Sequence, residues 1–206
     1  MPSERLVYVV DDDEAVRESL AALLDAKGYM VRTFGLARDF LAAAPSLRPG
    51  CLVADIRMPE MDGLELQRHL TERNFNFPLI VITGHGDVPL AVRAMKAGAV
   101  DFIEKPFALD AILGSLEAAL GRLAETGAED PLAVTAGARL ALLSPREREV
   151  LQGLLAGLPN KSIAYDLAIS PRTVEIHRAR VMDKMGARSL SELIRMSLAA
   201  GPQPRP

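Results

Sequence analysis

Short apolar segments alternate with longer amphipathic segments five times within the first 124 residues, and this alternation limits the folds open to the chain. The apolar segments predict strands at 6–10, 30–34, 51–54, 78–83 and 101–104. The segments between them place apolar residues such as Val16, Leu20 and Leu24 at helical spacing, and they predict helices at 14–27, 38–43, 62–73, 87–97 and 108–124. Strands that alternate with helices form a parallel sheet that helices cover on both faces.

The connections between these strands restrict their order in the sheet. Right-handed crossovers leave few topologies, and we expect an α/β fold with the flavodoxin-like order 2-1-3-4-5. In that order the switch point lies between the first and third strands, and ligands bind beyond the carboxyl ends of the strands there. The first strand runs into Asp11 and Asp12, and the third ends at Asp55. A rigid scaffold is therefore expected to bring these acids together.

The rest of the chain carries only helical patterns. Ser144 and Glu147 have the spacing of a capping box, and further helices are expected at 160–167, 171–185 and from 189 onward. Between the two parts, the composition is rich in Gly, Pro, Thr and acids and lacks periodicity. The predicted organisation is an α/β domain over 1–124, a linker over 125–139 and an all-α, four-helix domain over 140–206.

Charge and composition separate the two domains further. Residues 1–139 hold 14 Lys and Arg against 21 Asp and Glu, a net charge of −7, whereas residues 140–206 hold 10 against 6, a net charge of +4. A basic second domain favours nucleic acid as its partner. No apolar run approaches the roughly 20 residues of a membrane span, and no signal-peptide pattern precedes the first strand. The single Cys51 permits no internal disulfide, so we expect a cytoplasmic protein in which Cys51 is a small buried hydrophobic residue.

Polar side chains at the ends of four expected strands suit one reaction. Asp11 and Asp12 follow the first strand, Asp55 ends the third, Thr83 ends the fourth and Lys105 follows the fifth. Clustered carboxylates repel one another, so their ionised form requires a cation, and Mg²⁺ binds carboxylate oxygens. The set predicts a magnesium-assisted phosphoryl transfer in which Asp55 is the acceptor.

The predicted Mg²⁺ site takes its oxygens from three acids and one backbone carbonyl. We expect Asp12 and Asp55 as direct ligands, Asp11 as a ligand through a water molecule, and the carbonyl of Arg57 as a further ligand. The cation would neutralise charge on the transferring phosphoryl group and orient it for in-line attack.

Lys105 and Thr83 are expected to bind the phosphoryl group, through an ammonium charge and a hydroxyl hydrogen bond respectively. Each residue also has a plainer interpretation. A helix dipole favours acids such as residues 11–13 at a helix start, and Lys105-Pro106 also suits a simple turn. Because all of these groups lie at strand ends of one predicted sheet, phosphoryl transfer is favoured over the plainer interpretations.

Several short motifs give the first domain a family resemblance: Val9-Val10-Asp11-Asp12, Asp55 followed by Met58-Pro59 and Met61-Asp62-Gly63, Thr83-Gly84, Ala97-Gly98-Ala99 and Lys105-Pro106-Phe107. Residues 4–124 resemble the receiver domain of bacterial two-component response regulators. The resemblance implies that Asp55 receives a phosphoryl group from a phosphohistidine of a sensor histidine kinase. It also implies that Thr83 and Phe102 form a switch pair and that the bond between Lys105 and Pro106 is cis. From the residues alone, Phe102 is equally well a core residue.

The segment from Asn160 to Met185 predicts a helix-turn-helix. Ser170 would cap the second helix, whose N-terminal half enters the major groove of DNA in such motifs. Val174, Val181 and Met185 have the spacing of core positions. The residues expected to face DNA are Arg172, Thr173, Glu175, Ile176, Arg178 and Ala179. A small basic dimerisation module is the plainer alternative.

Motifs of the second domain carry a second resemblance: Leu143-Ser144-Pro145-Arg146-Glu147-Arg148-Glu149-Val150-Leu151, Asn160-Lys161-Ser162-Ile163-Ala164 and Ser170-Pro171-Arg172-Thr173-Val174-Glu175-Ile176-His177. They resemble the LuxR-like output domain of FixJ- and NarL-type regulators, and over the whole chain the resemblance extends to nitrogen-fixation regulators of that class. It implies a transcription regulator that dimerises when phosphorylated and binds double-stranded DNA. The target sequence, the direction of regulation and contact with RNA polymerase stay open.

Two other classes of protein compete with this interpretation. A hydrolase with an aspartyl-phosphate intermediate, like haloacid-dehalogenase phosphatases, needs its nucleophile on the first strand and a cap over the substrate. Here Asp55 is on the third strand and no cap insertion exists, so we expect only self-phosphorylation and slow self-dephosphorylation, not an enzyme. An adaptor whose helical domain binds protein is the second rival, and salt-dependent DNA binding would separate it.

Overall fold

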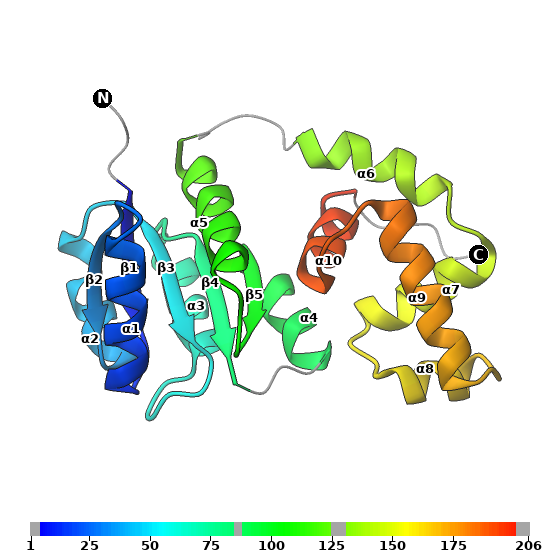
Figure 1. The fold of residues 1–206 in the computed structure, drawn as a ribbon, viewed down its shortest axis with the longest axis horizontal. Helices are drawn as coiled ribbons and strands as arrows, with labels where there is room; N and C mark the ends of the chain where they lie inside the picture. The colour runs from blue at the N-terminus through cyan, green and yellow to red at the C-terminus, as the bar shows by residue number, and fades with distance from the viewer. Residues whose placement is uncertain (1–4, 85–87, 125–130, 201–206) are drawn as a thin grey trace. The chain divides into compact units, whose positions relative to one another are not determined.

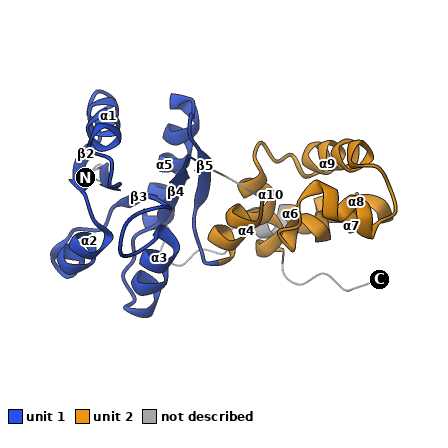
Figure 2. Cartoon of the chain, turned by 90° about the horizontal axis from the view of Figure 1, so that it is seen from below, with its two compact units in different colours: residues 1–85, 97–127 blue, residues 86–96, 128–206 orange. Residues whose placement is uncertain are grey.

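The computed structural model of the chain describes residues 5–84, 88–124 and 131–200 (Figure 1). Contacts divide the chain into two compact units, one of residues 1–85 and 97–127 and the other of residues 86–96 and 128–206 (Figure 2). The helix α4 (Val88–Lys96) is therefore grouped with the C-terminal helices. Among the described helices, none combines the length and the apolar character that crossing a membrane requires.

The first unit is built on a sheet of five parallel strands in the order β2-β1-β3-β4-β5, which confirms the expected topology. The strands are β1 (Leu6–Val10), β2 (Met30–Phe34), β3 (Cys51–Asp55), β4 (Leu79–Thr83) and β5 (Asp101–Glu104). Because β1 pairs with β3, the switch point lies between the strands that lead into Asp11 and end at Asp55.

The helices of this unit follow the sequence prediction closely. They are α1 (Glu14–Asp25), α2 (Ala37–Ala43) with a short 3₁₀ turn η1 (Ala44–Ser46), α3 (Gly63–Glu72) and α5 (Leu109–Ala124). The first helix ends two residues earlier than predicted, before Gly28 at φ +81°, a left-handed conformation that glycine adopts without a steric penalty. The predicted helix start at 87 lies outside the described residues.

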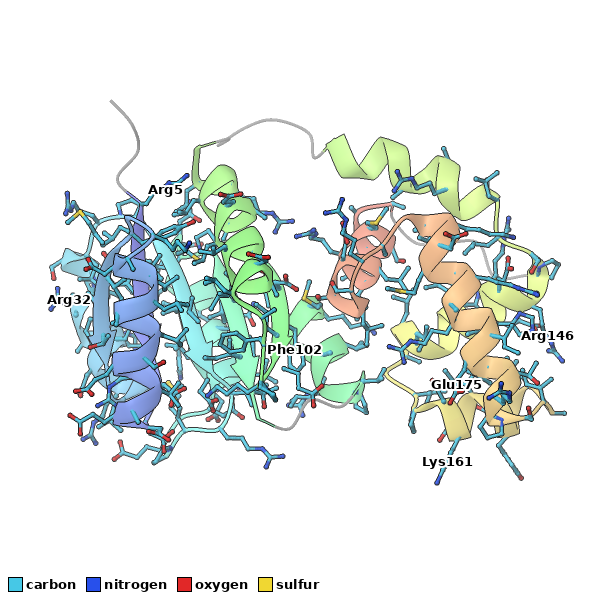
Figure 3. All side chains as sticks on the ribbon, in the orientation of Figure 1. Arg5, Arg32, Phe102, Arg146, Lys161 and Glu175 are labelled. Atoms are coloured by element: carbon cyan, nitrogen blue, oxygen red, sulfur yellow. The ribbon has the colours of Figure 1, made fainter. Side chains whose placement is uncertain are left out.

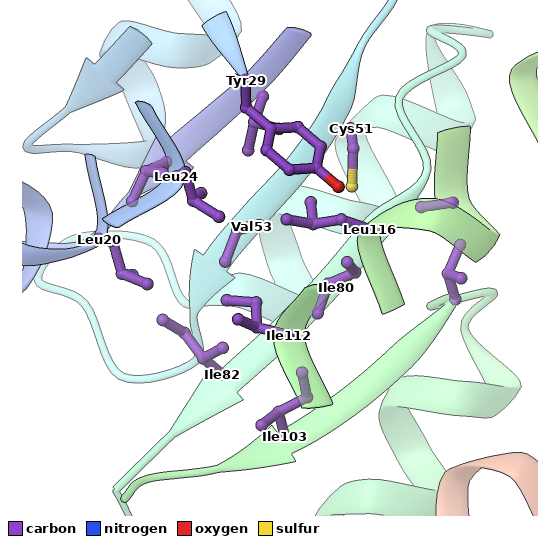
Figure 4. Packing of buried hydrophobic residues seen from close by; sticks show 14 residues of the cluster. Leu20, Leu24, Tyr29, Cys51, Val53, Ile80, Ile82, Ile103, Ile112 and Leu116 are labelled. Atoms are coloured by element: carbon purple, nitrogen blue, oxygen red, sulfur yellow. The ribbon is translucent and has the colours of Figure 1, made fainter. Parts of the chain in front are cut away.

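Alternate strand residues build a core on each face of the sheet. On one face, Val7, Val9 and Val53 join Leu24 of α1 and Leu116 of α5 in a continuous buried cluster (Figure 4). The thiol of Cys51 lies in the same cluster with no exposed surface, which confirms its prediction as a buried hydrophobic residue. The other face holds an aromatic cluster with ring centroids 5.3–6.4 Å apart, formed by Tyr8, Phe34, Phe40 and Phe77.

The second unit contains a run of five helices. They are α6 (Pro131–Ala141), α7 (Pro145–Leu155), α8 (Asn160–Asp166), α9 (Pro171–Met185) and α10 (Leu190–Ala199). The capping box of Ser144 and Glu147 is present at the start of α7, and Ser170 caps α9. Val174, Val181 and Met185 are fully buried in the core of this unit, as their spacing predicted.

The segment 125–139, predicted as a linker without helical periodicity, contains a helix in its second half. Residues 125–130 lie outside the described residues, but residues 131–139 belong to α6. Pro131 is compatible with this helix because the first helical residue needs no backbone N–H partner. Ala136 and Leu140 are buried in the core formed with α7, α9 and α10, so tertiary packing stabilises a helix that the composition obscured.

Candidate functional site

Two acids and one lysine from three different strand ends meet at the carboxyl edge of the sheet. Nζ of Lys105 donates hydrogen bonds to Oδ2 of Asp11 and Oδ1 of Asp55, each at 2.8 Å. Both acids are buried, with 1% of Asp11 and 7% of Asp55 exposed. Because both oxygens bind the same Nζ, Oδ2 of Asp11 and Oδ1 of Asp55 lie close to each other.

The reach of Lys105 explains why a lysine can complete this cluster. It follows β5, which is separated from β3 by β4, and neighbouring strands lie about 4.8 Å apart. A long, flexible stem is needed to carry a positive charge across that span. The backbone N–H of Lys105 donates to the carbonyl of Thr83 at 2.7 Å, which fixes its main chain beside the end of β4. The bond between Lys105 and Pro106 is cis, in agreement with the resemblance.

The loop after β3 holds the carboxylate of Asp55 in one orientation. The backbone N–H of Arg57 donates to its Oδ2 at 2.6 Å, while Lys105 occupies Oδ1. The N–H of Gly63 donates to the carbonyl of Ile56 at 3.0 Å and folds the loop back. A Cβ at Gly63 would stand 2.7 Å from the carbonyl oxygen of Asp55, so this close approach of two backbones requires glycine.

The acids at positions 11–13 divide between the two interpretations that the sequence allowed. Asp13 is the N-cap of α1, and its side chain accepts from the N–H groups of Ala15 and Val16. Asp11 instead points to Lys105 and also accepts from the N–H of Asp13 at 3.0 Å. The helix-start interpretation is therefore confirmed for Asp13, whereas Asp11 lies beside Asp55 and Lys105, where the predicted chemistry requires it.

Asp12 differs from its neighbours because it is exposed. Its backbone carbonyl and that of Asp11 both accept from Nη1 of Arg17, at 3.0 and 2.7 Å. Arg17 was not identified from the sequence, where it reads as an ordinary helix residue of α1. It holds the loop that carries both acids, and only the folded backbone shows which carbonyls it reaches.

The predicted switch residues occupy neighbouring strands. Thr83 ends β4 and is buried, whereas Phe102 on β5 is half-buried (Figure 3). In the strand register Phe102 lies opposite Val81, two residues before Thr83. Phe102 is thus less enclosed than a core residue of the central strands such as Val53.

Electrostatics at this edge favour a cation. Burial lowers the pKa of Lys105, but the hydrogen bonds that it donates to Asp11 and Asp55, together with the negative charge of these acids, outweigh that effect and raise its pKa above the usual value. With an ammonium between two carboxylates, the cluster has one negative charge in excess, and the exposed Asp12 adds another. Within the described residues, no three His, Cys, Asp or Glu side chains group as a metal site by themselves. Mg²⁺ often uses only one or two carboxylates with other oxygen ligands, so the donor chemistry fits it.

The second candidate site is the exposed side of α9. Arg172, Glu175 and Ala179 are exposed and Ile176 is 46% exposed, although Ile is usually buried. Figure 3 marks Glu175 on this helix. Of the other residues predicted to face DNA, Thr173 and Arg178 are half-buried. The structure therefore presents the predicted set on or beside one face, opposite the buried residues of the same helix.

An ion pair between exposed Lys184 in the last turn of this helix and buried Glu147 of α7 was missed in the sequence. Nζ of Lys184 donates to Oε2 of Glu147 at 2.7 Å, and Glu147 is only 3% exposed. The Lys184 bond and the N–H of Ser144 lower the pKa of Glu147 to about 2. Glu147 was recognised only as a capping residue; its pairing with a residue 37 positions later has no local sequence signal.

Two family models match the chain. Residues 7–117 match the response regulator receiver domain, and residues 141–197 match the bacterial regulatory proteins of the luxR family. The first match covers the sheet that carries Asp55. The second covers α7 to α10 almost to the end of α10, while all but the last residue of α6 lies before it.

Known proteins resemble the chain over nearly its whole length. The transcriptional regulatory protein FixJ of Rhizobium meliloti is 57% identical over 195 residues, which cover 95% of this chain and 96% of that protein. FixJ of Azorhizobium caulinodans is 55% identical over 204 residues, covering 99% and 97%. A crystal structure of full-length FixJ from B. japonicum has a TM-score of 0.58 and 50% identity, and covers 96% of this chain and 98% of that one.

Proposed function

The chain belongs to the FixJ-like response regulators, which join a receiver domain to a luxR-family DNA-binding domain, and we propose that phosphorylation of Asp55 controls its binding to DNA. The observation that carries this proposal is the cluster of Asp11, Asp55 and Lys105. Asp55 is buried at a strand end, and hydrogen bonds to both of its oxygens fix the orientation of the carboxylate.

Asp55 is the proposed nucleophile. One of its carboxylate oxygens attacks the phosphorus of a phosphohistidine on a sensor histidine kinase, the bond from phosphorus to the histidine nitrogen breaks, and an acyl phosphate forms on Asp55. Lys105 already donates to Oδ1 of Asp55 and, with its raised pKa, remains an ammonium that can follow the new phosphoryl oxygens. Asp11, Asp12, Asp55 and the carbonyl of Arg57 would hold Mg²⁺, which when bound neutralises charge on the phosphoryl group.

The proposed response begins with the added charge. A phosphoryl group brings about −1.5 to −2 charges and strong hydrogen-bond acceptors. Thr83 would turn its hydroxyl toward the phosphoryl group and vacate space that Phe102 fills, since Thr83 is buried and Phe102 still has exposed surface. This rearrangement would favour dimers of the phosphorylated chain. Two linked DNA-binding modules then bind paired half-sites far more tightly than one module binds a single half-site.

The biological setting follows from the same proposal. We extend the proposal to activation of nitrogen-fixation genes with RNA polymerase as a further partner; the similarity to proteins named FixJ supports the nitrogen-fixation setting. Because both the DNA and the kinase's phosphoryl donor group are cytoplasmic, we place the protein there. The reaction is a stoichiometric self-phosphorylation followed by slow self-dephosphorylation, not the turnover of an enzyme.

A phosphodonor assay tests the reaction. The full chain is mixed with acetyl phosphate and Mg²⁺, and phosphate incorporation is measured by mass. We expect one phosphoryl group per chain in the wild type and none in Asp55→Asn or after chelation of Mg²⁺. Release of inorganic phosphate far above the amount of protein would favour the hydrolase instead.

Salt-dependent binding to genomic DNA fragments tests the other half of the proposal. Binding by a basic helical surface weakens steeply as salt rises, because the protein displaces counterions from the phosphates. Absence of DNA binding at low salt, together with capture of a protein, would favour the adaptor.

A further inference from the structure

The C-terminal end of α9 is closed by a residue from another helix. Gly186 adopts φ +64° and ends the helix, and the N–H groups of Gly186 and Ala187 donate to the carbonyls of Asp183 and Met182 at 2.9 Å. Nη1 of Arg139 donates to the carbonyl of Met185 at 2.7 Å. A cation at this end also interacts favourably with the helix dipole.

Arg139 comes from α6, which lies across this end of α9 in Figure 1. On the same helix, Ala136 has no exposed surface and Leu140 is 4% exposed, and both belong to the core cluster that contains Val181 and Met185. All of α6 except its last residue precedes the stretch that matches the luxR-family model. A helix outside the matched domain therefore shares its core and fixes its longest helix.

The fit of the Arg139 guanidinium is close. A Cβ at Gly186 would stand 2.7 Å from its Nη1 and 3.2 Å from its Cζ. The left-handed backbone favours glycine at this position, and a Cβ here would force the guanidinium of Arg139 to shift from its place. The guanidinium is seated directly against the turn that ends α9.

A second bond ties the same helix end to the segment after α6. Nζ of Lys184 donates to the carbonyl of Leu142 at 3.2 Å and to the carboxylate of Glu147 at 2.7 Å. Arg139 therefore approaches α9 from α6, and Lys184 reaches from α9 to the connection between α6 and α7. The opposite end of α9 has its own cap in Ser170, which accepts from the N–H of Thr173 at 3.1 Å.

We propose that Arg139 is a positioning residue for DNA recognition and that α6 is an integral part of the DNA-binding unit. The proposal rests on the DNA-binding role of α9. The helix is about 22 Å long for its 15 residues. A small tilt at Met185 is therefore carried to the residues at the other end that face DNA, such as Arg172 and Glu175. Arg139 sets that tilt without touching DNA.

Three variants of the full chain test the proposal. Arg139→Ala removes the bond to Met185, and Arg139→Lys keeps a cationic donor. Arg148→Ala is the matched control, because Arg148 also donates to two main-chain carbonyls, those of Leu143 and Ala141, but to none on α9. Affinity is measured, with acetyl phosphate and Mg²⁺ present, for a genomic fragment selected by the wild type and for a scrambled fragment of equal length.

Arg139→Ala is expected to weaken binding to the selected fragment about tenfold, the equivalent of one hydrogen bond to a charged donor, while scrambled DNA is bound within about twofold of wild type. Arg139→Lys should recover most of the loss. Two outcomes would overturn the proposal. Equal losses of affinity in Arg139→Ala and Arg148→Ala would show that Arg139 contributes only stability. Equal losses of affinity for the selected and the scrambled fragment would show that it contributes only positive charge. A wild type that selects no fragment would instead overturn the DNA-binding role on which the proposal rests.

A double-mutant cycle gives an independent readout. Gly186→Ala introduces a Cβ against the guanidinium, so alone it should weaken binding to the selected fragment at least as much as Arg139→Ala does. In the Arg139→Ala background the clash is gone, and Gly186→Ala should cost clearly less. Strict additivity of the two changes would show that Arg139 and Gly186 act separately and would refute the positioning role.

Discussion

The two units place their charged side chains in opposite environments. In the first unit the groups proposed to carry the chemistry, Asp11, Asp55 and Lys105, are paired inside the protein. In the second, the ion pair of buried Glu147 and exposed Lys184 holds α7 to α9, while most of the residues proposed to meet DNA are exposed on α9. Function and stability thus depend on the same atoms in the first unit and on different atoms in the second.

The largest effect is expected at Lys105, because this residue contributes to both the stability and the proposed chemistry of the first unit. Lys105→Ala leaves two buried acids without their cation and should lower the free energy of unfolding of the first unit by about 3 kcal/mol. Burial raises the pKa of the Cys51 thiol, and Cys51 is the chain's single cysteine, so its alkylation in urea reports opening of this unit alone. The added change Asp11→Asn should recover part of the loss by removing one acid. Wild-type protection of Cys51 in Lys105→Ala would contradict the pairing.

A glycine in each unit sharpens the comparison. Gly63→Ala places a Cβ 2.7 Å from a backbone oxygen of Asp55 and should cost about 2 kcal/mol and slow phosphorylation. Gly153→Ala places a Cβ 2.7 Å from Cγ1 of Ile163, a branched core side chain that is 1% exposed, and should also cost about 2 kcal/mol, but without loss of DNA binding where the variant is folded.

Urea unfolding and phosphate incorporation measure the two outcomes. Gly114→Ala is the control within the first unit, because its Cβ, at an exposed position of α5, meets nothing within 4 Å and should stabilise the helix by up to about 1 kcal/mol. If Gly63→Ala behaved like this control, the close approach at the Asp55 loop would be disproved.

Glu147 tests whether stability in the second unit is separate from function. Its pKa is lowered from the usual 4.5 to about 2, so the stability it contributes is present above pH 4.5 and is lost as the pH falls toward 2. Glu147→Gln should destabilise the helical unit by about 2 kcal/mol at neutral pH and remove that part of the acid dependence.

The pKa of the Glu147 carboxyl can be measured by NMR, with acid unfolding followed by circular dichroism. Under conditions in which wild type and Glu147→Gln are both folded, the affinity of Glu147→Gln for its specific DNA should stay within about threefold of wild type. Lys105→Ala, by contrast, is expected to impair phosphorylation as well as stability. An ordinary carboxyl pKa near 4.5 would remove the ion pair from the account.

The smallest effect is expected at the surface of α9. Glu175→Ala should leave stability within about 0.5 kcal/mol and change the preference at one base pair by about 1 kcal/mol. Asp183→Ala, also exposed but in the last turn of the same helix, is the control and should change neither. Selection from a randomised DNA library measures the preference; an identical selected sequence for wild type and Glu175→Ala would exclude Glu175 from base contact.

The regular elements and the residues at strand ends were predictable because their signals are local. Apolar runs and helical spacing set the strands and helices, and the parallel alternation dictated which ends face the same edge. The proximity of Asp11, Asp55 and Lys105 was therefore predictable, because the carboxyl ends of parallel strands lie at the same edge of the sheet. The sequence left open which acid of residues 11–13 caps the helix, and the side-chain directions show that Asp13 does so while Asp11 turns toward Lys105.

What the sequence could not show are contacts that depend on tertiary packing. Residues 131–139 lack a strong helical pattern, and α6 forms because Ala136 and Leu140 are buried by other helices. The bonds from Arg139 to Met185 and from Lys184 to Glu147 span 46 and 37 positions. No periodicity encodes such pairs. Arg139 lies in a segment of linker composition, and nothing in that segment indicates that it binds the carbonyl of Met185.

The most direct test of the central claim is the affinity of the full chain for a selected genomic fragment, with and without acetyl phosphate and Mg²⁺, in the wild type and in Asp55→Asn. The account predicts at least about tenfold tighter binding on phosphorylation of the wild type and no change in Asp55→Asn, whose basal binding stays intact. An equal gain in both proteins, or no gain in a wild type shown to be phosphorylated, would contradict control of the DNA-binding unit through Asp55.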